Sequence, residues 1–293
     1  MKRFLWLGLL FLSASWLFII PQFMIPDLVA GSLCVIVGIG CVIVGISRSV
    51  QKQMEIRYTA LLIPLAAALL FVPFPYNLGL VVLIIGLLAS LLSYKFERVH
   101  AVPLGISLAG VLLLIQMIVF PFYISFISHG HRLDILSPAI SQLANILGVQ
   151  TSTNNGLLFV QTVQQTSAVT VTWEKLGFFL ALNMFLGALF VFVMFYKKRQ
   201  MLRNTMIFFI TGALYAILRF VAVLVLYQTT ADLSVFWDPL VTTLSFIPFA
   251  LLLMKLLPLT DCSELTIQTP SLRLTKKQLT ALFLMFLCIF SLT

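Results

Sequence analysis

One arginine lies inside an apolar run and is the side chain best placed to do chemistry. Arg219 follows the apolar run 214–218, about eight residues before the outer end of an expected membrane-spanning helix, or roughly 12 Å into the bilayer at 1.5 Å per residue. Arginine at mid-membrane costs about 2.5–3.5 kcal/mol, so it is expected to serve a function and to have a polar partner. The alternative is an arginine that extends toward the headgroups or only locks helices together.

Two acidic side chains are candidates to pair with Arg219, because each begins a neighbouring expected helix on the same side. Glu174 is the nearer candidate and Asp238 is the second. The helix dipole also favours an acid in a first turn, and Trp is a common anchor at headgroup level, so both could be ordinary helix starts. The sequence predicts an outer-face site with Arg219 and Glu174 as catalytic-type residues and Trp173, Lys175, Trp237 and Asp238 as binding residues.

The histidines and cysteines indicate no second site. His129 and His131 lie beside Asp134 and could supply a base, although such a segment is more often a solvated turn. Three of the four cysteines lie in apolar runs and one lies in a polar connection, with no CxxC or Cys/His ligand spacing. We therefore expect no metal and no cofactor. The cysteines are Cys34, Cys41, Cys288 and, in the polar connection, Cys262.

The elements that must position these residues are membrane helices. Hydrophobic residues make up 61% of the chain and charged residues only 9%, against about 25% charged residues in soluble domains. This composition excludes a soluble globular domain. The net charge of +9 could indicate nucleic-acid binding, but the Lys and Arg residues lie between apolar runs, as in cytoplasmic loops. The expected partner is the lipid bilayer, with no nucleic acid.

The apolar runs predict an all-α integral membrane protein, a polytopic bundle of about eight or nine transmembrane helices. Basic residues follow the even-numbered spans, which places the N-terminus in the cytoplasm and the C-terminus outside. The start resembles a secretory signal, but no small-residue cleavage site follows, so we expect a retained first helix. The expected spans are 4–20, 27–47, 58–73, 77–94, 104–127, 173–196, 205–227, 238–257 and 279–293.

One long connection, 128–172, is expected to be an ordered insertion on the extracytoplasmic side. Apolar residues at helical spacing over 135–149 predict an amphipathic helix along the outer interface. Asn155-Gly156 is a typical two-residue hairpin turn between segments rich in Val, Thr and Phe, which predicts a small β-hairpin.

The chain thus divides into four regions. Residues 1–127 form an N-terminal five-helix region, 128–172 the insertion, 173–257 a three-helix core, and 258–293 a cytoplasmic connection with a final helix. The last span stops abruptly at Thr293, so the protein is expected either to continue on the outer face or to end in a short helix. A bacterial or archaeal plasma membrane is the expected location.

From about Leu133 to Leu257, the order of features resembles the exosortase/archaeosortase family of membrane proteases and transpeptidases. That family combines an amphipathic stretch, a short β-rich excursion, an outer helix end with Cys-Ser/Thr-Gly-Leu, a basic turn, a helix with Asn-x-x-Arg, and a His at the next outer helix start. The corresponding segments here are Ile146-Leu147-Gly148-Val149, Asn155-Gly156, Trp173-Glu174-Lys175-Leu176, Lys197-Lys198-Arg199, Ala216-Ile217-Leu218-Arg219 and Phe236-Trp237-Asp238.

The resemblance implies recognition of exported proteins that carry C-terminal sorting tails, by a cysteine enzyme in which Arg and His assist the thiol. Trp173 stands at the nucleophile position, Trp237 near the His and Ala216 at the Asn, so only Arg219 carries over. We expect recognition without a covalent thioester, and enzymatic activity stays open. The alternatives are a small transporter or permease component that uses Arg219 and Glu174, and a membrane anchor for a C-terminal extracytoplasmic domain.

Overall fold

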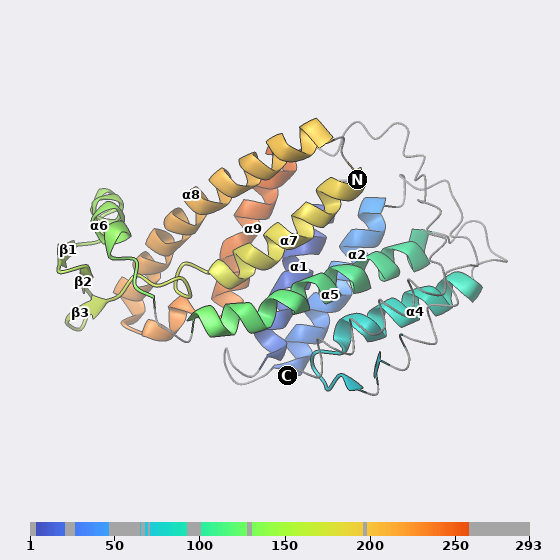
Figure 1. Ribbon diagram of the computed structural model, residues 1–293. Coiled ribbons are helices and arrows are strands. Elements are labelled where there is room, and N and C mark those ends of the chain that lie inside the picture. Colours follow the sequence, from blue (N-terminus) through green and yellow to red (C-terminus); the bar gives the residue numbers. More distant parts are fainter. Residues whose placement is uncertain are drawn as a thin grey trace.

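The computed structural model describes residues 4–20, 27–46, 65, 68–69, 71–92, 101–127, 131–195 and 198–257, and it is mostly helical. Its long helices pack side by side as one bundle, with a small sheet and a short helix at one end (Figure 1). The bundle helices are α1 (Phe4–Ile19), α2 (Leu28–Ile46), α4 (Leu78–Leu92), α5 (Ala101–Ile127), α7 (Phe178–Phe195), α8 (Lys198–Thr230) and α9 (Pro239–Leu256).

Three of these helices are long and apolar enough to cross a membrane: α2, α9, and α8 over Gln200–Thr230. Four more described helical stretches are apolar but shorter, in α1, α4, α5 and α7. The expected final span, 279–293, and the connection before it lie outside the described residues. The expected third span, 58–73, lies almost entirely outside them.

Small residues let neighbouring helices approach closely. A Cβ built on Gly38 of α2 would lie 2.8 Å from Leu12 of α1, and one on Gly86 of α4 would lie 2.5 Å from the backbone nitrogen of Ser107 in α5. Glycine at such positions brings helix backbones into van der Waals contact, which is how helices associate where lipid removes the hydrophobic driving force. Further contacts pair Gly45 of α2 with Leu5, and Gly79 of α4 with Leu114. Contact positions therefore rise along one helix as they fall along the other, so each pair is antiparallel.

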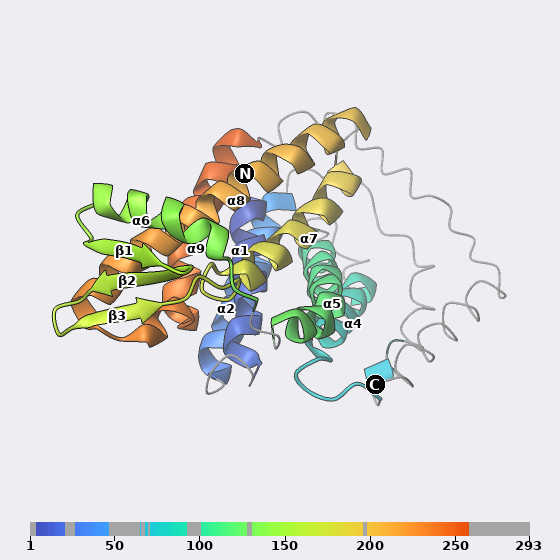
Figure 2. The ribbon, with the colours of Figure 1, turned by 60° about the vertical axis from the view of Figure 1, so that its left-hand side comes forward.

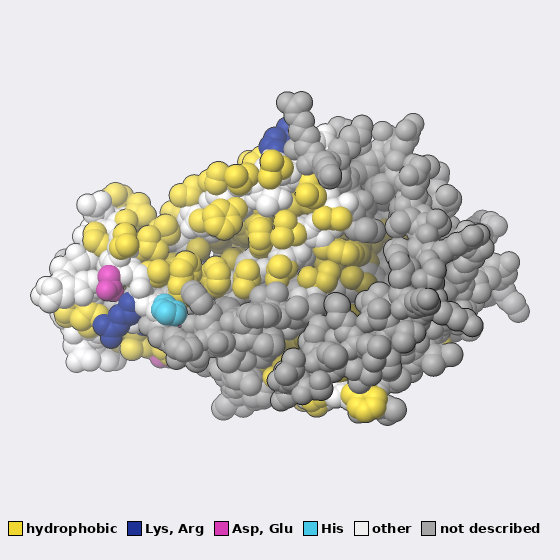
Figure 3. Space-filling model, in the orientation of Figure 1, with side chains coloured by type: hydrophobic (Ala, Val, Ile, Leu, Met, Phe, Trp, Pro, Cys, Tyr) yellow, Lys and Arg dark blue, Asp and Glu magenta, His cyan; other side chains and the backbone are white. Residues whose placement is uncertain are grey.

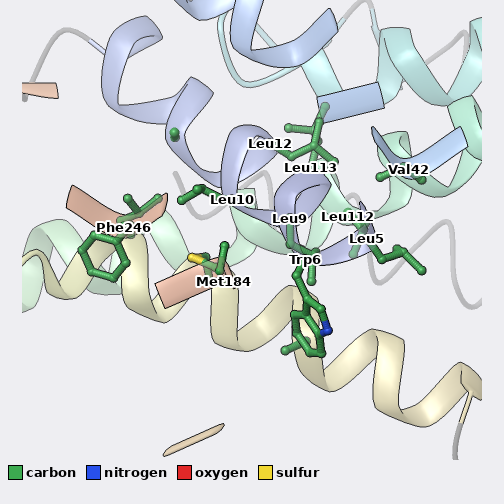
Figure 4. Close-up of a cluster of buried hydrophobic side chains, with 14 of the residues drawn as sticks. Leu5, Trp6, Leu9, Leu10, Leu12, Val42, Leu112, Leu113, Met184 and Phe246 are labelled. Carbon is green, nitrogen blue, oxygen red and sulfur yellow. The ribbon is translucent and has the colours of Figure 1, made fainter. Parts of the chain in front are cut away.

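Helix α1 lies at the centre of the described bundle and contacts α2, α5, α7 and α9. Its apolar side chains fill the space between these helices, with Trp6 directed toward α7 and Leu9 beside Leu112 (Figure 4). The Trp6 indole N–H donates to the Leu257 carbonyl at 3.3 Å, and its ring lies 5.8 Å from that of Phe192. A helix that is apolar all round is thereby buried on all sides.

The segment between α5 and α7 forms a compact unit beside the bundle (Figure 2). It contains a 3-10 turn η4 (Asp134–Leu136), helix α6 (Ser137–Ile146) and strands β1 (Thr151–Asn154), β2 (Leu157–Gln161) and β3 (Thr166–Val169). The strands pair antiparallel in the order β1-β2-β3. Asn155 and Gly156, with φ of 49° and 77°, connect β1 to β2, and two positive φ angles match the twist of a tight hairpin.

Helix α8 carries this unit. Its 33 residues exceed the approximately 20 that a membrane span requires, and the surplus at its C-terminal end packs against α6 and the sheet. Ile140 of α6, Leu158 of β2 and Leu224 of α8 are fully buried in this second core. The Val163 N–H also donates to the Gln228 carbonyl at 3.1 Å, so the loop after β2 is attached to the same helix.

Three element boundaries differ from those expected. Helix α7 begins at Phe178 instead of 173, because Gly177 has φ of +73° and ends a separate turn over 173–177. Helix α8 covers 198–230 instead of 205–227, and packing against α6 supports the extension at its C-terminal end. Helix α6 covers only 137–146, and Gly148 with φ of +86° follows it.

On the face shown in Figure 3, the described surface is apolar over the bundle helices. Hydrophobic side chains cover α7 and α8 in Figure 3, and charged side chains appear near the start of α8 and on the sheet unit. Exposed apolar side chains recur along α8 every three or four residues, as in a helix that faces lipid. They are Leu202, Met206, Phe209, Ile210, Leu214, Leu218, Val225 and Leu226.

Candidate functional site

Arg219 is buried, with 2% of its surface exposed, and its guanidinium joins three separate segments. Nη1 donates to the Lys175 carbonyl at 2.7 Å, and Nη2 donates to the Phe236 carbonyl at 3.2 Å and to Thr242 Oγ1 at 2.9 Å. Nε donates to Ser245 Oγ at 2.8 Å. All four acceptors are neutral oxygens, and these bonds fix the plane of the guanidinium. We call Arg219 and these four acceptors the arginine clamp.

Local capping places two of the three segments. The Asp238 carboxylate accepts from the backbone N–H groups of Leu240 and Val241 at 2.8 and 3.0 Å, and Pro239 follows as the first residue of α9. This is a favourable N-terminus for a helix. Asp232 likewise accepts from the Ser234 N–H and begins the 3-10 turn η5 (Leu233–Phe236), whose last carbonyl is the one that Arg219 binds.

The third segment is the turn 173–177, which depends on a glycine. Gly177 N–H donates to the Glu174 carbonyl at 2.8 Å and Phe178 N–H to the Trp173 carbonyl at 3.1 Å, and the φ of +73° at Gly177 lies in the region that glycine adopts without strain. A Cβ at this position would lie 2.8 Å from the Phe246 ring and 3.0 Å from Arg219 Nη1. The turn therefore approaches the guanidinium as closely as its backbone allows.

Aromatic rings surround the clamp on its bundle side. The Phe246 ring lies 5.7 Å from Arg219 Cζ, within the range of a cation–π interaction. Tyr215, one turn before Arg219, donates its hydroxyl to the Ser245 carbonyl and stacks on Phe249 with centroids 5.0 Å apart. The cation therefore lies in apolar, water-excluding surroundings, where its field is screened much less than in water.

Lys175 lies above the clamp, on the same turn whose carbonyl binds Arg219. Its ammonium donates to Thr170 O and Thr170 Oγ1, each at 3.1 Å, and lies 5.9 and 6.0 Å from the rings of Phe236 and Trp237. Burial lowers the pKa of Lys175, and the neighbouring Glu174 carboxylate opposes this shift. Burial raises the pKa of Glu174, and Lys175 opposes that shift.

The structure places the predicted site residues in different local surroundings. Arg219, Lys175 and Trp237 belong to one cluster through the contacts above. Trp173 packs on Phe178, with ring centroids 4.8 Å apart. The Asp238 carboxylate caps α9, and the charge that acts on Glu174 is that of Lys175. Among the other reactive side chains, His131 is exposed, Cys34 and Cys41 lie in α2, and His129, Cys262 and Cys288 lie outside the described residues.

The sequence reading missed the residues that hold Arg219. Thr242 and Ser245 are polar residues three apart in a mostly apolar helix, so they share one helix face. This spacing is the sequence feature that could have identified them. No sequence feature of Thr170 or Gly177 predicts that either residue belongs to the site. Thr172 is also new: its Oγ1 is buried and has no hydrogen-bond partner within the described part of the chain. A buried hydroxyl without a partner next to Trp173 is a group to which a ligand could bind.

The arrangement is suited to binding a carboxylate or stabilising an oxyanion. A guanidinium holds its proton at all accessible pH values, so Arg219 supplies charge and donors but no acid–base step. No group of three or more metal-ligating side chains occurs among the residues that the structure describes. No family model matches the chain, and neither a curated protein nor a solved structure is significantly similar to it.

Proposed function

We propose that this chain is an exosortase-like membrane protein that recognises the C-terminal sorting segment of an exported protein without cleaving it through a thiol. The observation that carries the proposal is the arginine clamp, a buried cation held by neutral oxygens where the 173–177 turn, η5 and α9 meet. In the exosortase/archaeosortase family, which this chain resembles, the catalytic face is formed by an arginine within one helix and by the outer start of the preceding helix. Here Trp173 stands where that family has its cysteine, and an indole cannot attack a carbonyl.

Groups next to the clamp support recognition of a polar or anionic peptide. An ammonium has three donors, and in the described residues Lys175 directs two of them to Thr170, so one remains for a ligand. Thr172 Oγ1 adds a hydroxyl that has no partner within the described part of the chain, and Trp237 is 37% exposed. The proposal places the peptide backbone or a carboxylate against Lys175 and Thr172, in the field of Arg219.

The finer topology is part of the same proposal. It has eight or nine spans, a cytoplasmic N-terminus, and an extracytoplasmic unit formed by α6 and the sheet, in a bacterial or archaeal plasma membrane. The helix directions support it, because α1, α5 and α8 run one way and α2, α4, α7 and α9 run the other. This is the alternation that the basic loops predict from the sequence.

A binding measurement tests the recognition. The protein in nanodiscs is titrated against a fluorescent peptide that contains a short polar motif, an apolar helix and a basic tail. We expect Lys175→Met and Arg219→Met to weaken binding about tenfold or more, since a charge-assisted hydrogen bond contributes about 1.5–3 kcal/mol. Arg203→Met, at an exposed arginine of the same helix α8, is the matched control and should bind normally. Equal affinity of all variants would contradict the proposal.

The absence of thiol chemistry is tested separately. The protein is incubated with the same peptide and a thiol-reactive probe, and both peptide and cysteines are analysed by mass spectrometry. We expect intact peptide. Peptide cleavage that is lost when a cysteine is alkylated would replace the recognition proposal by a thiol enzyme.

A second candidate is a small transporter, which the polar side chains inside the bundle favour. Gln116 and Asn183 are both 1% exposed, in helices that are mostly apolar, and buried polar groups within membrane spans are typical of transport pathways. In this reading Arg219 and Glu174 form the coupling pair. Flux in liposomes that is abolished by Arg219→Ala would support it, and absence of flux in the unmodified protein would exclude it.

A further inference from the structure

A polar layer crosses the bundle interior, away from the arginine clamp. A Cβ on Gly187 of α7 would lie 2.5 Å from Leu9 of α1 and 3.6 Å from Leu112 of α5, so these three residues form an apolar contact level. One helical turn away on each helix, positions four residues apart lie on the same face. Those positions are Ser13, Gln116 and Asn183.

Hydrogen bonds join the members of this polar layer. Gln116 Nε2 donates to Ser13 Oγ at 2.8 Å and approaches the Asn183 carbonyl at 3.5 Å. Gln116 Oε1 accepts from the Trp16 indole N–H at 3.1 Å. Ser13, Gln116 and Asn183 are each at most 1% exposed, so the layer lies fully inside the bundle.

The side-chain amide of Asn183 is the unsatisfied member of the layer. Neither its Nδ2 nor its Oδ1 has a hydrogen-bond partner among the residues that the structure describes, although both atoms are buried. An amide offers two donors and two acceptors, and in a lipid-embedded bundle no bulk water reaches it. Buried amides of this kind are commonly satisfied by ordered water, which can both donate and accept.

We infer that the layer formed by Ser13, Gln116 and Asn183 is a binding site for ordered water inside the bundle. The described parts of α1, α5 and α7 carry no acidic or basic side chain near the layer, so a bound ion would lack a counter-charge. The close contacts at Gly187 leave no space for a ligand at that neighbouring level. Water is small and neutral, and it serves the donors and acceptors of Asn183 simultaneously.

This inference is independent of the proposed function, because it uses no residue of the clamp. It assigns Asn183 to the interior of the bundle as a water ligand that connects α7 to α1 and α5. Bound water would complete the hydrogen bonding of the three helices at one level. Their relative register is then set by polar contacts at that level as well as by apolar packing.

Radiolytic labelling in ¹⁸O water tests the site, because hydroxyl radicals formed from a bound water oxidise the side chains beside it. In nanodiscs, we expect Trp16 to incorporate label although its exposed fraction is only 2%. Asn183→Leu should reduce this labelling at least fivefold. Thr211→Val, which removes a hydroxyl bonded to the carbonyls of its own helix α8, should leave it unchanged.

Two results would overturn the inference. The first is no label at Trp16 in the unmodified protein, a measurement that needs no variant to fold. The second is undiminished labelling of Trp16 in a folded Asn183→Leu protein. A thermal melt gives an independent readout: Asn183→Leu should lower the unfolding temperature if water satisfies the amide, and a higher unfolding temperature would also overturn the inference.

Discussion

At the scale of single residues, Arg219 holds separate segments of the chain together. Its guanidinium satisfies the carbonyls of Lys175 and Phe236, which belong to segments far apart in the sequence. A buried carbonyl that loses its partner costs about 1–3 kcal/mol. The side chain that we propose to act on a ligand therefore also holds the proposed site together.

Replacing Arg219 should consequently destabilise the fold. We expect Arg219→Met to lower the free energy of unfolding by roughly 2–4 kcal/mol, because several buried acceptors lose their donor while the apolar volume is retained. Thermal unfolding in detergent, followed by intrinsic fluorescence, measures the effect. Arg203→Met in the exposed part of α8 should change the unfolding temperature little, and equal effects of the two variants would contradict this account.

Glu174 gives a pH dependence whose sign follows from burial. The folded-state pKa of Glu174 is raised, so its contribution to stability is present below the unfolded-state pKa and is lost as pH rises through the folded-state pKa. Glu174→Gln removes this loss of stability, because an amide does not ionise. We expect its unfolding temperature to exceed that of the unmodified protein near neutral pH by less than about 2 °C, because the group is partly exposed. The difference should vanish in acid, and a difference that grew in acid would contradict the assignment.

At the scale of elements, the 173–177 turn brings backbone and guanidinium together, and two glycines allow this to be tested. Gly177 and Gly148 both have positive φ, but a Cβ at Gly148 would meet nothing within 4 Å, whereas one at Gly177 would meet Arg219 and Phe246. Both Ala substitutions carry backbone strain of about 1–2 kcal/mol.

Gly177→Ala should therefore lower the free energy of unfolding by about 1–3 kcal/mol more than Gly148→Ala does, because its methyl group also displaces the arginine clamp. Equilibrium unfolding of the two variants gives the difference directly. We also expect Gly177→Ala to bind the peptide more weakly than the unmodified protein, and Gly148→Ala to bind it normally. Similar stability and binding of both variants would show that the turn does not position Arg219.

Sequence patterns identify elements here better than they identify contacts. Apolar run length gives the positions of α1, α2, α5 and α9 closely, and Asn155-Gly156 marks the connection between β1 and β2. The start of α7 could not be placed, because a left-handed glycine at 177 reads the same in sequence as a helical one. The hydrogen-bond acceptors of Arg219 are backbone carbonyls and hydroxyls that tertiary packing brings together. Because these groups are neutral, no pattern of charged residues in the sequence predicts them.

At the scale of the whole molecule, α8 links the two ends of the bundle. Its 33 residues extend over about 50 Å at 1.5 Å per residue, more than the approximately 30 Å hydrocarbon core of a bilayer. Apolar side chains cover the middle of this length, with charges near its start and on the sheet unit at its end (Figure 3). A helix with this distribution should place the sheet unit and its own start on opposite sides of the membrane.

Single-cysteine labelling in cells measures this arrangement. All four native cysteines are replaced by Ser, and a cysteine is introduced at Val163, which is 77% exposed beside the sheet, or at the exposed Arg203 near the start of α8. We expect a membrane-impermeant maleimide to label V163C in intact cells and R203C only after permeabilisation. Labelling of both from the same side would mean that α8 does not cross the membrane, and the reverse pattern would place the arginine clamp near the cytoplasmic face, where it could not meet an exported peptide.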